Sequence, residues 1–138
     1  MQKSGKIKKI LGICAGFQIL TSRIEERGKK FTGIGLLDAI TKPISADKSN
    51  CNGWRRCSET IDYLCSFGTP KNGAYGLYYN HSCGVYPDDK MDYRYSFLSK
   101  KEFAVAFQSE NVFAFQFHPE KSGLAGSHIL SKVLQNNV

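Results

Sequence analysis

Several features that mark other classes of protein are scarce or missing in this sequence. The five cysteines include no Cys-x-x-Cys pair and are odd in number (Cys14, Cys51, Cys57, Cys65 and Cys83). Because zinc sites and disulfide scaffolds usually need paired cysteines, the sequence predicts no metal site and no disulfide framework. No cofactor is predicted, and a reducing, cytoplasmic setting fits this cysteine usage best.

Long apolar runs are also missing. The stretch from Ile10 to Leu20 is too short to span a bilayer, so we expect no membrane segment. A basic stretch from Lys3 to Lys9 precedes it, and together the two resemble a signal peptide. No small-residue cleavage site follows Leu20, which disfavours secretion. Cleavage there, or before Cys14 as in a lipoprotein, stays open as the alternative.

Acidic residues are outnumbered, with 12 Asp and Glu against 19 Lys and Arg and a formal charge of +7. The basic residues are scattered in pairs such as Lys29-Lys30 rather than gathered in one block. This distribution indicates a solvated surface first, and a face for an anionic substrate or acidic partner second. No nucleic-acid-binding motif accompanies the charge, so nucleic acid is not an expected partner. With 41% hydrophobic residues, the 138-residue chain can form one domain with a core.

The most informative stretch is Gly12-Ile13-Cys14-Ala15-Gly16. A β-prone run precedes it, and an amphipathic helix is predicted from Ala15 to about Arg27, closed by Gly28. Gly-x-Cys-x-Gly is the cysteine form of the nucleophile elbow, whose two glycines relieve crowding at the turn. A sulfur at a helix N-terminus is favoured as the thiolate. The alternative is a buried cysteine in a strand–helix crossover.

A second chemical cluster is His118-Pro119-Glu120, at the end of a predicted strand. His118 could act as a base toward Cys14, and Glu120 could orient its ring. Pro119 restricts the backbone between them. On its own this tripeptide is only a turn after a strand. Because nucleophiles and ligands gather at the carboxyl ends of strands in α/β folds, the cysteine and histidine together favour a catalytic site.

The other predicted elements give an α/β order. We expect a strand from about Gly33 to Pro43, a polar irregular stretch over 45–60, a short helix over 61–67 and a strand over 74–81. A charged loop is expected over 87–95, then a hairpin of strands 103–108 and 112–117, and a final helix over 123–138. The single tryptophan, Trp54, lies in the polar stretch and is either a core plug or a partner-facing anchor.

Five motifs occur in a consistent order: 12–18, 33–37, Gly53-Trp54, Tyr78–Ser82 and Gln116–Gly123. This series resembles the class I (triad) glutamine amidotransferases over nearly the whole chain. Within them it is most similar to the glutaminase subunit of imidazole glycerol phosphate synthase. The resemblance implies a flavodoxin-like, mostly parallel sheet flanked by helices. Residues 1–138 would form a single partial amidotransferase domain that lacks the N-terminal strands.

The resemblance also implies roles for individual residues. Cys14 would attack the glutamine amide, with His118 as general base and acid and Glu120 as its orienting partner. The substrate and oxyanion would be held by Ala15, Gln18 and Ser82. Trp54, Tyr78 and Lys121 would face a (β/α)₈-barrel cyclase that receives ammonia in histidine biosynthesis. Two alternatives are a related subunit for surface-polysaccharide sugar modification and a non-catalytic binding module.

Departures from the family pattern accompany these matches. The elbow begins at residue 14, so the glycine-rich loop that carries the second oxyanion donors in the family is expected to be absent. Losing one such donor costs about 10²–10³ in rate, so we expect feeble activity from the isolated chain. Ala15 replaces a usual leucine and Cys83 a usual aromatic residue. These changes concern the choice of partner more than the triad.

Overall fold

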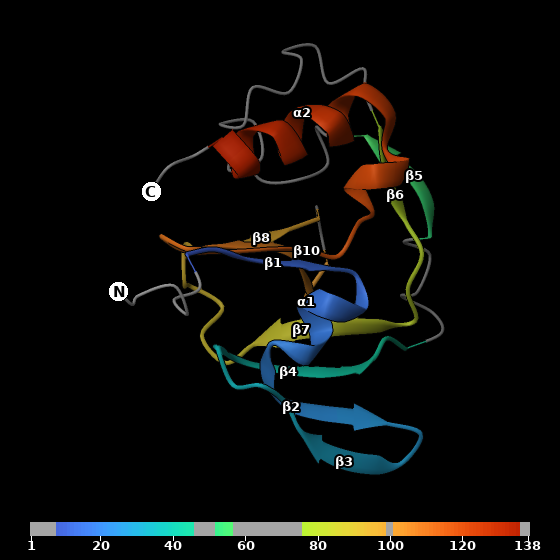
Figure 1. Ribbon diagram of the computed structural model, residues 1–138. Coiled ribbons are helices and arrows are strands. Elements are labelled where there is room, and N and C mark those ends of the chain that lie inside the picture. The colour runs from blue at the N-terminus through green and yellow to red at the C-terminus, as the bar shows by residue number, and fades with distance from the viewer. Residues whose placement is uncertain (1–7, 46–51, 57–75, 99–100, 136–138) are drawn as a thin grey trace.

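A computed structural model describes residues 8–45, 52–56, 76–98 and 101–135, and Figure 1 shows their arrangement. A curled sheet carries helices α1 and α2 on its two faces, and a two-stranded ribbon stands at one side. The main-sheet strands are β1 (Ile10–Ile13), β2 (Thr21–Glu26), β3 (Lys29–Thr32), β4 (Leu37–Pro43), β7 (Cys83–Pro87), β8 (Tyr95–Phe97), β9 (Ala104–Gln108) and β10 (Val112–Phe115). The ribbon is β5 (Gly53–Arg56) with β6 (Gly76–Tyr79). The helices are α1 (Ala15–Ile19), the 3₁₀ helix η4 (Pro119–Lys121) and α2 (Gly123–Gln135).

The main sheet is mixed, with strand order β1-β10-β9-β7-β4-β2-β3 and β8 beside β9. Among the described pairs, β1 with β10 and β2 with β4 are parallel, and the others are antiparallel. The α/β class is therefore confirmed, but the expectation of a mostly parallel sheet is wrong for this part of the fold. The physical reason is chain length: two- and three-residue turns join β2 to β3 and β9 to β10, and parallel neighbours need longer crossovers.

The helix predicted from Ala15 to Arg27 is also wrong, because α1 ends at Ile19 and a strand follows. Its last carbonyls are taken by groups outside the helix. The hydroxyls of Thr21 and Thr41 donate to Gln18 O, and the backbone N–H of Ile34 donates to Ile19 O. These bonds replace those of a further helical turn. Gly28 belongs to the two-residue turn between β2 and β3 instead of closing a helix.

Most of the later elements match the predictions. β4 ends at Pro43, β9 and β10 form the expected hairpin, and α2 begins at Gly123 as expected. β6 falls within the strand predicted over 74–81, whereas Gly53–Arg56 forms a strand inside the stretch predicted to be irregular. The helix predicted over 61–67 lies outside the described residues. Strands β3, β7 and β8 were not predicted.

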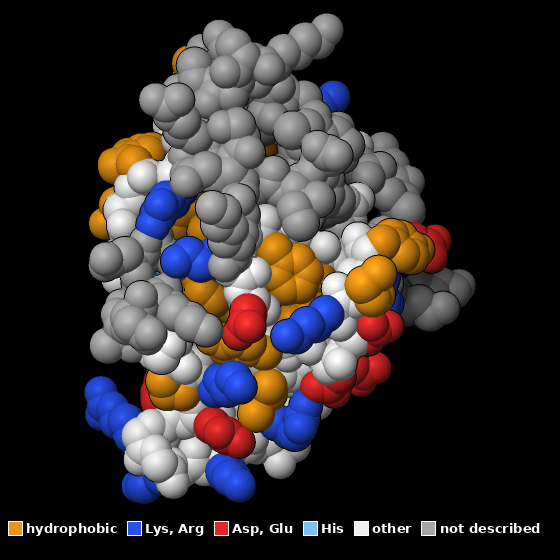
Figure 2. All heavy atoms as spheres, turned by 180° about the vertical axis from the view of Figure 1, so that it is seen from behind, with side chains coloured by type: hydrophobic (Ala, Val, Ile, Leu, Met, Phe, Trp, Pro, Cys, Tyr) orange, Lys and Arg blue, Asp and Glu red, His pale blue; other side chains and the backbone are white. Residues whose placement is uncertain are grey.

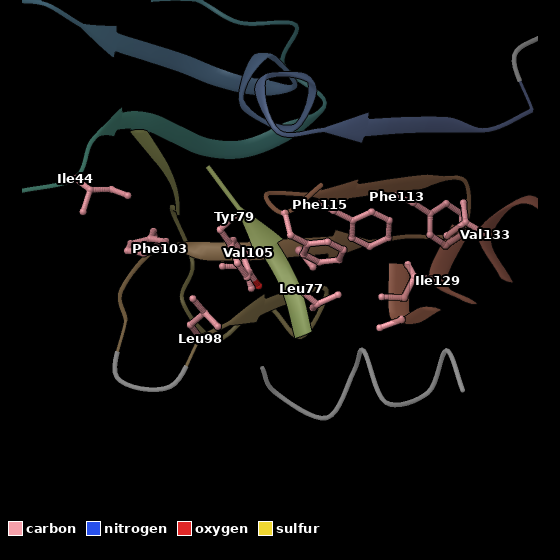
Figure 3. Close-up of a cluster of buried hydrophobic side chains, with 13 residues drawn as sticks. Ile44, Leu77, Tyr79, Leu98, Phe103, Val105, Phe113, Phe115, Ile129 and Val133 are labelled. Carbon is pink, nitrogen blue, oxygen red and sulfur yellow. The ribbon is translucent and has the colours of Figure 1, made fainter. Parts of the chain in front are cut away.

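Two apolar clusters lie on opposite faces of the main sheet. One packs α2 against the sheet through Phe113, Phe115, Ile129 and Val133, and it reaches the ribbon through Tyr79 (Figure 3). The other lies within the curl around α1, with Phe17 and Leu20 as its helix-side members. Both clusters contact β10 or β1, so the strands that carry the candidate site are packed from both sides.

Charges of both signs are interspersed on the surface. Figure 2 shows Lys and Arg side chains alternating with Asp and Glu on the described part of one face. One such pair is Arg23 with Asp88. This agrees with a solvated surface on that face. Within the described part of the chain, no helix combines the length and the apolar character needed to cross a membrane.

Candidate active site

The site is built at the ends of two neighbouring parallel strands. β1 and β10 run side by side with Ile13 opposite Phe115, and the N–H of Cys14 donates to Phe115 O at 2.8 Å. Cys14 therefore follows one strand at the same edge where His118 follows the other. The main spatial prediction, that these two segments meet at neighbouring strand tips, is confirmed at the level of the backbone.

Cys14 has a backbone conformation that residues other than glycine rarely adopt, with φ 53° and ψ −106°. Such a conformation costs on the order of 1–3 kcal/mol and is typical of functional turns. Gly12 permits the turn, because a Cβ there would lie 2.9 Å from the backbone C and O of Gly16. A Cβ on Gly16 would meet nothing within 4 Å. The steric argument therefore holds for the first glycine of the motif and is wrong for the second.

The sulfur of Cys14 is half-buried among backbone and amide groups. The thiol lies 3.6 Å from the carbonyl oxygen of Asn80 and 3.7 Å from Gln116 Nε2. Burial raises the pKa of Cys14, and this effect outweighs the hydrogen bonds from Ala15 N–H and Gln116 that lower it. The prediction of a favoured thiolate is therefore wrong in its net direction. The five-residue helix α1 contributes one backbone donor, which is too little to offset burial.

His118 and Glu120 form a hydrogen-bonded pair, with Nδ1 2.9 Å from Glu120 Oε2. Burial acts to raise the pKa of Glu120, but the hydrogen bonds from His118 and from its own backbone, with the nearby positive charge, leave that pKa lowered. The carboxylate is thus ionised at neutral pH and can accept from Nδ1–H. The other ring nitrogen, Nε2, is then the one left for proton transfer.

The turn that carries His118 is fixed by the ribbon and by Ser122. The N–H of His118 donates to Tyr78 O at 2.8 Å. The buried Ser122 hydroxyl donates to His118 O at 2.6 Å and accepts from Tyr78 N–H at 2.9 Å. Ser122 was not predicted as a site residue. Its signal in the sequence was weak, a single serine between a charged turn and a helix.

Gln18 and Gln116 form a pair of linked amides beside the cysteine. Gln18 Nε2 donates to Cys83 O at 3.1 Å and to Gln116 Oε1 at 3.3 Å. Gln116 lies in the last of the five sequence motifs, but no role was predicted for it. One signal could have found it, since it is a polar side chain between Phe115 and Phe117 and is fully buried. Buried amides normally mark a site where specific hydrogen bonds are needed.

Ser82 lies on the loop that approaches Cys14, but among the described residues no hydrogen bond joins its side chain to Cys14. The loop contacts the sulfur through Asn80, while Ser82 is exposed; burial raises the pKa of the adjacent Cys83 thiol, and Ser82 acts to lower it. The neighbouring His81 is buried, with Nδ1 2.7 Å from Cys83 O. The backbone N–H of His81 donates to Asn52 Oδ1 at 2.7 Å, which ties this loop to the start of β5.

Trp54, Tyr78 and Lys121 are brought together beside His118. Trp54 and Tyr78 are opposite each other in the ribbon, with ring centroids 5.5 Å apart. Lys121 Nζ lies 6.0 Å from the Tyr78 ring, and that ring is 6.4 Å from the His118 ring. Trp54 is 61% exposed, so the core-plug interpretation is wrong, and the partner-facing role stays a prediction. We call these three residues the Trp54 surface.

A sequence profile described as "Glutamine amidotransferase class-I" matches residues 2–136. The chain belongs to this family. It is 34% identical over 131 residues to a protein of Methanocaldococcus jannaschii, covering 91% of this chain and 62% of the relative. A protein of Leptospira borgpetersenii is 33% identical over 119 residues (82% and 56%), and one of Chlorobaculum tepidum is 31% identical over 128 (91% and 62%). All three relatives are named imidazole glycerol phosphate synthase subunit HisH.

The amidotransferase chain spans only part of these relatives, between 56% and 62% of the three lengths. Family membership confirms the resemblance drawn from the five motifs. Of the residues assigned from it, Cys14, Ala15, Gln18, His118 and Glu120 lie at one edge of the sheet. The Trp54 surface adjoins them, and Ser82 lies on the loop that contacts Cys14 through Asn80.

Proposed function

We propose that this chain is part of a glutaminase, which releases ammonia from the side-chain amide of glutamine. The observation that carries the proposal is the parallel pairing of β1 with β10, which sets Cys14 beside the turn that holds the His118–Glu120 pair. A strained nucleophile, a ring nitrogen and an orienting carboxylate form the set that amide hydrolysis needs.

The proposed chemistry begins with a protonated thiol. Because burial raises the pKa of Cys14, the sulfur keeps its proton until a base removes it, and His118 Nε2 is the proposed base. Sγ attacks the amide carbon while His118 takes the thiol proton. His118 then gives that proton to the departing nitrogen, leaving a glutamyl thioester and ammonia. Water, activated by the same ring, hydrolyses the thioester to glutamate and frees Cys14.

Neighbouring groups support the binding half of the proposal. The backbone N–H of Ala15 acts to lower the pKa of Cys14, and it would donate to the oxyanion that forms next to Sγ. Gln18 uses both N–H groups within the protein and would meet the substrate through Oε1. Ser82, exposed on the loop that contacts Cys14 through Asn80, would bind the α-carboxylate or amine of glutamine.

The partner we propose is the cyclase subunit of an imidazole glycerol phosphate synthase, a (β/α)₈ barrel, in histidine biosynthesis. The relatives' name as subunits of that synthase supports this choice. The exposed indole of Trp54 supports a docking role, because aromatic anchors dominate protein–protein interfaces. Ammonia released at Cys14 would pass to the barrel across the Trp54 surface.

The test measures ammonia release from glutamine by the chain mixed with such a cyclase. We expect activity that is lost on Cys14→Ala and falls by about 10²-fold or more on His118→Asn. Glu120→Gln keeps a weaker acceptor and should retain part of the rate. If Cys14→Ala supports growth of a strain that depends on this protein as well as the wild type does, the chain is a binding module and the proposal fails.

A further inference from the structure

Two side-chain amides connect the backbone of β7 to the sulfur of Cys14. Gln18 Nε2 contacts both Cys83 O at 3.1 Å and Gln116 Oε1 at 3.3 Å. Gln116 Nε2 then lies 3.7 Å from Cys14 Sγ, which is within range for a hydrogen bond to sulfur. Cys83 of β7, Gln18 of α1 and Gln116 just after β10 thus form a chain of contacts that ends at Cys14 Sγ.

The direction of these hydrogen bonds is fixed at the β7 end. A backbone carbonyl only accepts, so the part of the Gln18 amide that faces Cys83 must be its nitrogen. The same nitrogen also faces Gln116, so the Gln116 atom that accepts this hydrogen bond must be its side-chain oxygen. The nitrogen of Gln116 is then the end that faces Cys14. Turning either amide over would set two donors or two acceptors face to face.

Burial holds the arrangement in place. The Gln116 side chain is fully buried at the end of β10, and its backbone N–H donates to Val105 O at 2.8 Å. A buried amide that swung away from these partners would leave polar groups without hydrogen bonds, which is costly in a protein interior. The side-chain group that Gln116 presents to the sulfur is therefore its N–H.

The charged and titratable groups that face Cys14 do not supply the same stabilisation. Glu120 acts to raise the pKa of the thiol and Lys121 to lower it, so their effects oppose each other. His118 lies on the same turn as both. Burial is the largest influence and raises the pKa, while the N–H groups of Ala15 and Gln116 act against it.

We infer that Gln116 stabilises the thiolate of Cys14 through an N–H donor, and that Gln18 is a positioning residue that sets the direction of that donor. The inference rests on the proposed function, because it concerns Cys14 as the nucleophile. As His118 removes the thiol proton, negative charge develops on Sγ next to the Gln116 N–H. A donor at that point favours the charged form over the neutral one.

The test is the pH dependence of Cys14 alkylation by iodoacetamide in the full chain, followed by mass spectrometry. Cleavage at Lys9 and Arg23 gives a peptide of residues 10–23 in which Cys14 is the single cysteine, so the other four do not interfere. Variants are Gln116→Leu and Gln18→Leu. Gln108→Leu is the matched control, because Gln108 lies at the far end of the β9–β10 hairpin, opposite Phe113.

Both site variants should shift the alkylation midpoint to higher pH and slow alkylation at pH 7 about fivefold or more, because the thiolate is the reacting form. Gln108→Leu should leave the profile unchanged. A wild-type midpoint in Gln116→Leu would overturn the inference. A shift in Gln116→Leu with none in Gln18→Leu would overturn the positioning role.

Two features keep this test decisive. Gln18 is half-buried, so Gln18→Leu should fold even if Gln116→Leu does not, and a wild-type midpoint in Gln18→Leu would then overturn the whole inference. The measurement needs neither glutamine nor a partner. A chain without glutaminase activity could therefore still be tested by alkylation. An unchanged alkylation midpoint would overturn the inference about Gln116 without contradicting the proposed function.

Discussion

At the scale of single residues, the backbone conformation of Cys14 depends on the missing side chain of Gly12. Gly12 has no Cβ, which allows the backbone of Gly16 to approach closely and the turn to form. The sequence motif led to this turn correctly, because steric crowding at a sharp strand–helix junction is a local property. It did not predict the raised pKa of the thiol. Burial raises that pKa, and the groups that contact the sulfur, Asn80 and Gln116, are distant from Cys14 in the sequence.

The two glycines of the elbow offer a matched pair of variants. Gly12→Ala should lower the free energy of unfolding by about 1–3 kcal/mol, because its Cβ would press on the Gly16 backbone at 2.9 Å. Gly16→Ala places its methyl in open space within a helix and should be neutral or stabilising by up to ~1 kcal/mol. Urea denaturation measures both. Equal effects of the two substitutions would contradict the assigned geometry.

His81 should make the stability depend on pH. Burial lowers its pKa, the hydrogen bond to Cys83 O acts the other way, and nearby His118 lowers it further. Within the described residues its buried Nε2 has no hydrogen-bond partner. Below the ordinary value of 6.5 the unfolded chain binds a proton that the folded chain resists, so stability falls as pH drops through that range and is level above it.

The measurement compares urea midpoints at about pH 7.5 and pH 5.5. The wild type should lose stability at the lower pH, and His81→Asn should lose less, because asparagine keeps a donor for Cys83 O and does not titrate. His128→Asn, at an exposed site on α2, is the control and should keep the full loss. A loss in His81→Asn as large as in the wild type would assign the effect to another group.

At the scale of elements, local turn signals predicted well, whereas helical spacing predicted α2 correctly and failed after α1. The β9–β10 hairpin and the start of α2 follow from short-range chemistry. The segment after α1 has apolar residues at helical spacing, yet it forms β2, because Thr21, Thr41 and Ile34 take the helix carbonyls. Thr41 and Ile34 come from segments 14 or more residues away along the chain, so a local sequence pattern cannot predict their hydrogen bonds.

The β2–β3 turn gives the prediction at this scale. Both central residues have positive φ, 51° at Arg27 and 75° at Gly28, as a tight hairpin turn requires. Arg27→Asn should therefore stabilise the protein by up to ~1 kcal/mol, since asparagine tolerates this region better. Gly28→Ala should destabilise by about 1 kcal/mol through backbone strain alone, because its Cβ would meet nothing within 4 Å. Opposite signs in thermal denaturation are the expected result, and equal signs would contradict the turn.

At the scale of the whole molecule, the order of motifs along the chain predicted the family, but it did not predict the directions of the strands. Those directions depend on which segments lie beside each other in space. The site is predicted better than the sheet, because Cys14 and His118 are fixed by one pair of strands in register. In the Trp54 surface, Tyr78 and Lys121 were predicted from the resemblance alone and Trp54 also from its polar surroundings, and the three side chains do lie together.

The Trp54 surface should control assembly with the cyclase. Trp54→Ala should weaken binding about 30-fold, as expected for an aromatic anchor worth about 2 kcal/mol. Tyr93→Ala is the matched control, since Tyr93 is 89% exposed in the loop after β7, at the end of that strand away from the site. Calorimetric titration measures both dissociation constants. Unchanged binding by Trp54→Ala would contradict the assignment of this surface.

The central claim is that Cys14 and His118 act together on glutamine at one edge of the sheet. The most direct measurement exposes the chain, with the cyclase present, to the glutamine analogue 6-diazo-5-oxo-L-norleucine and locates the label by mass spectrometry. We predict label on the peptide of residues 10–23, at a rate that falls at least tenfold in His118→Asn and that glutamine suppresses. Label confined to other cysteines, or a rate indifferent to His118, would contradict the account.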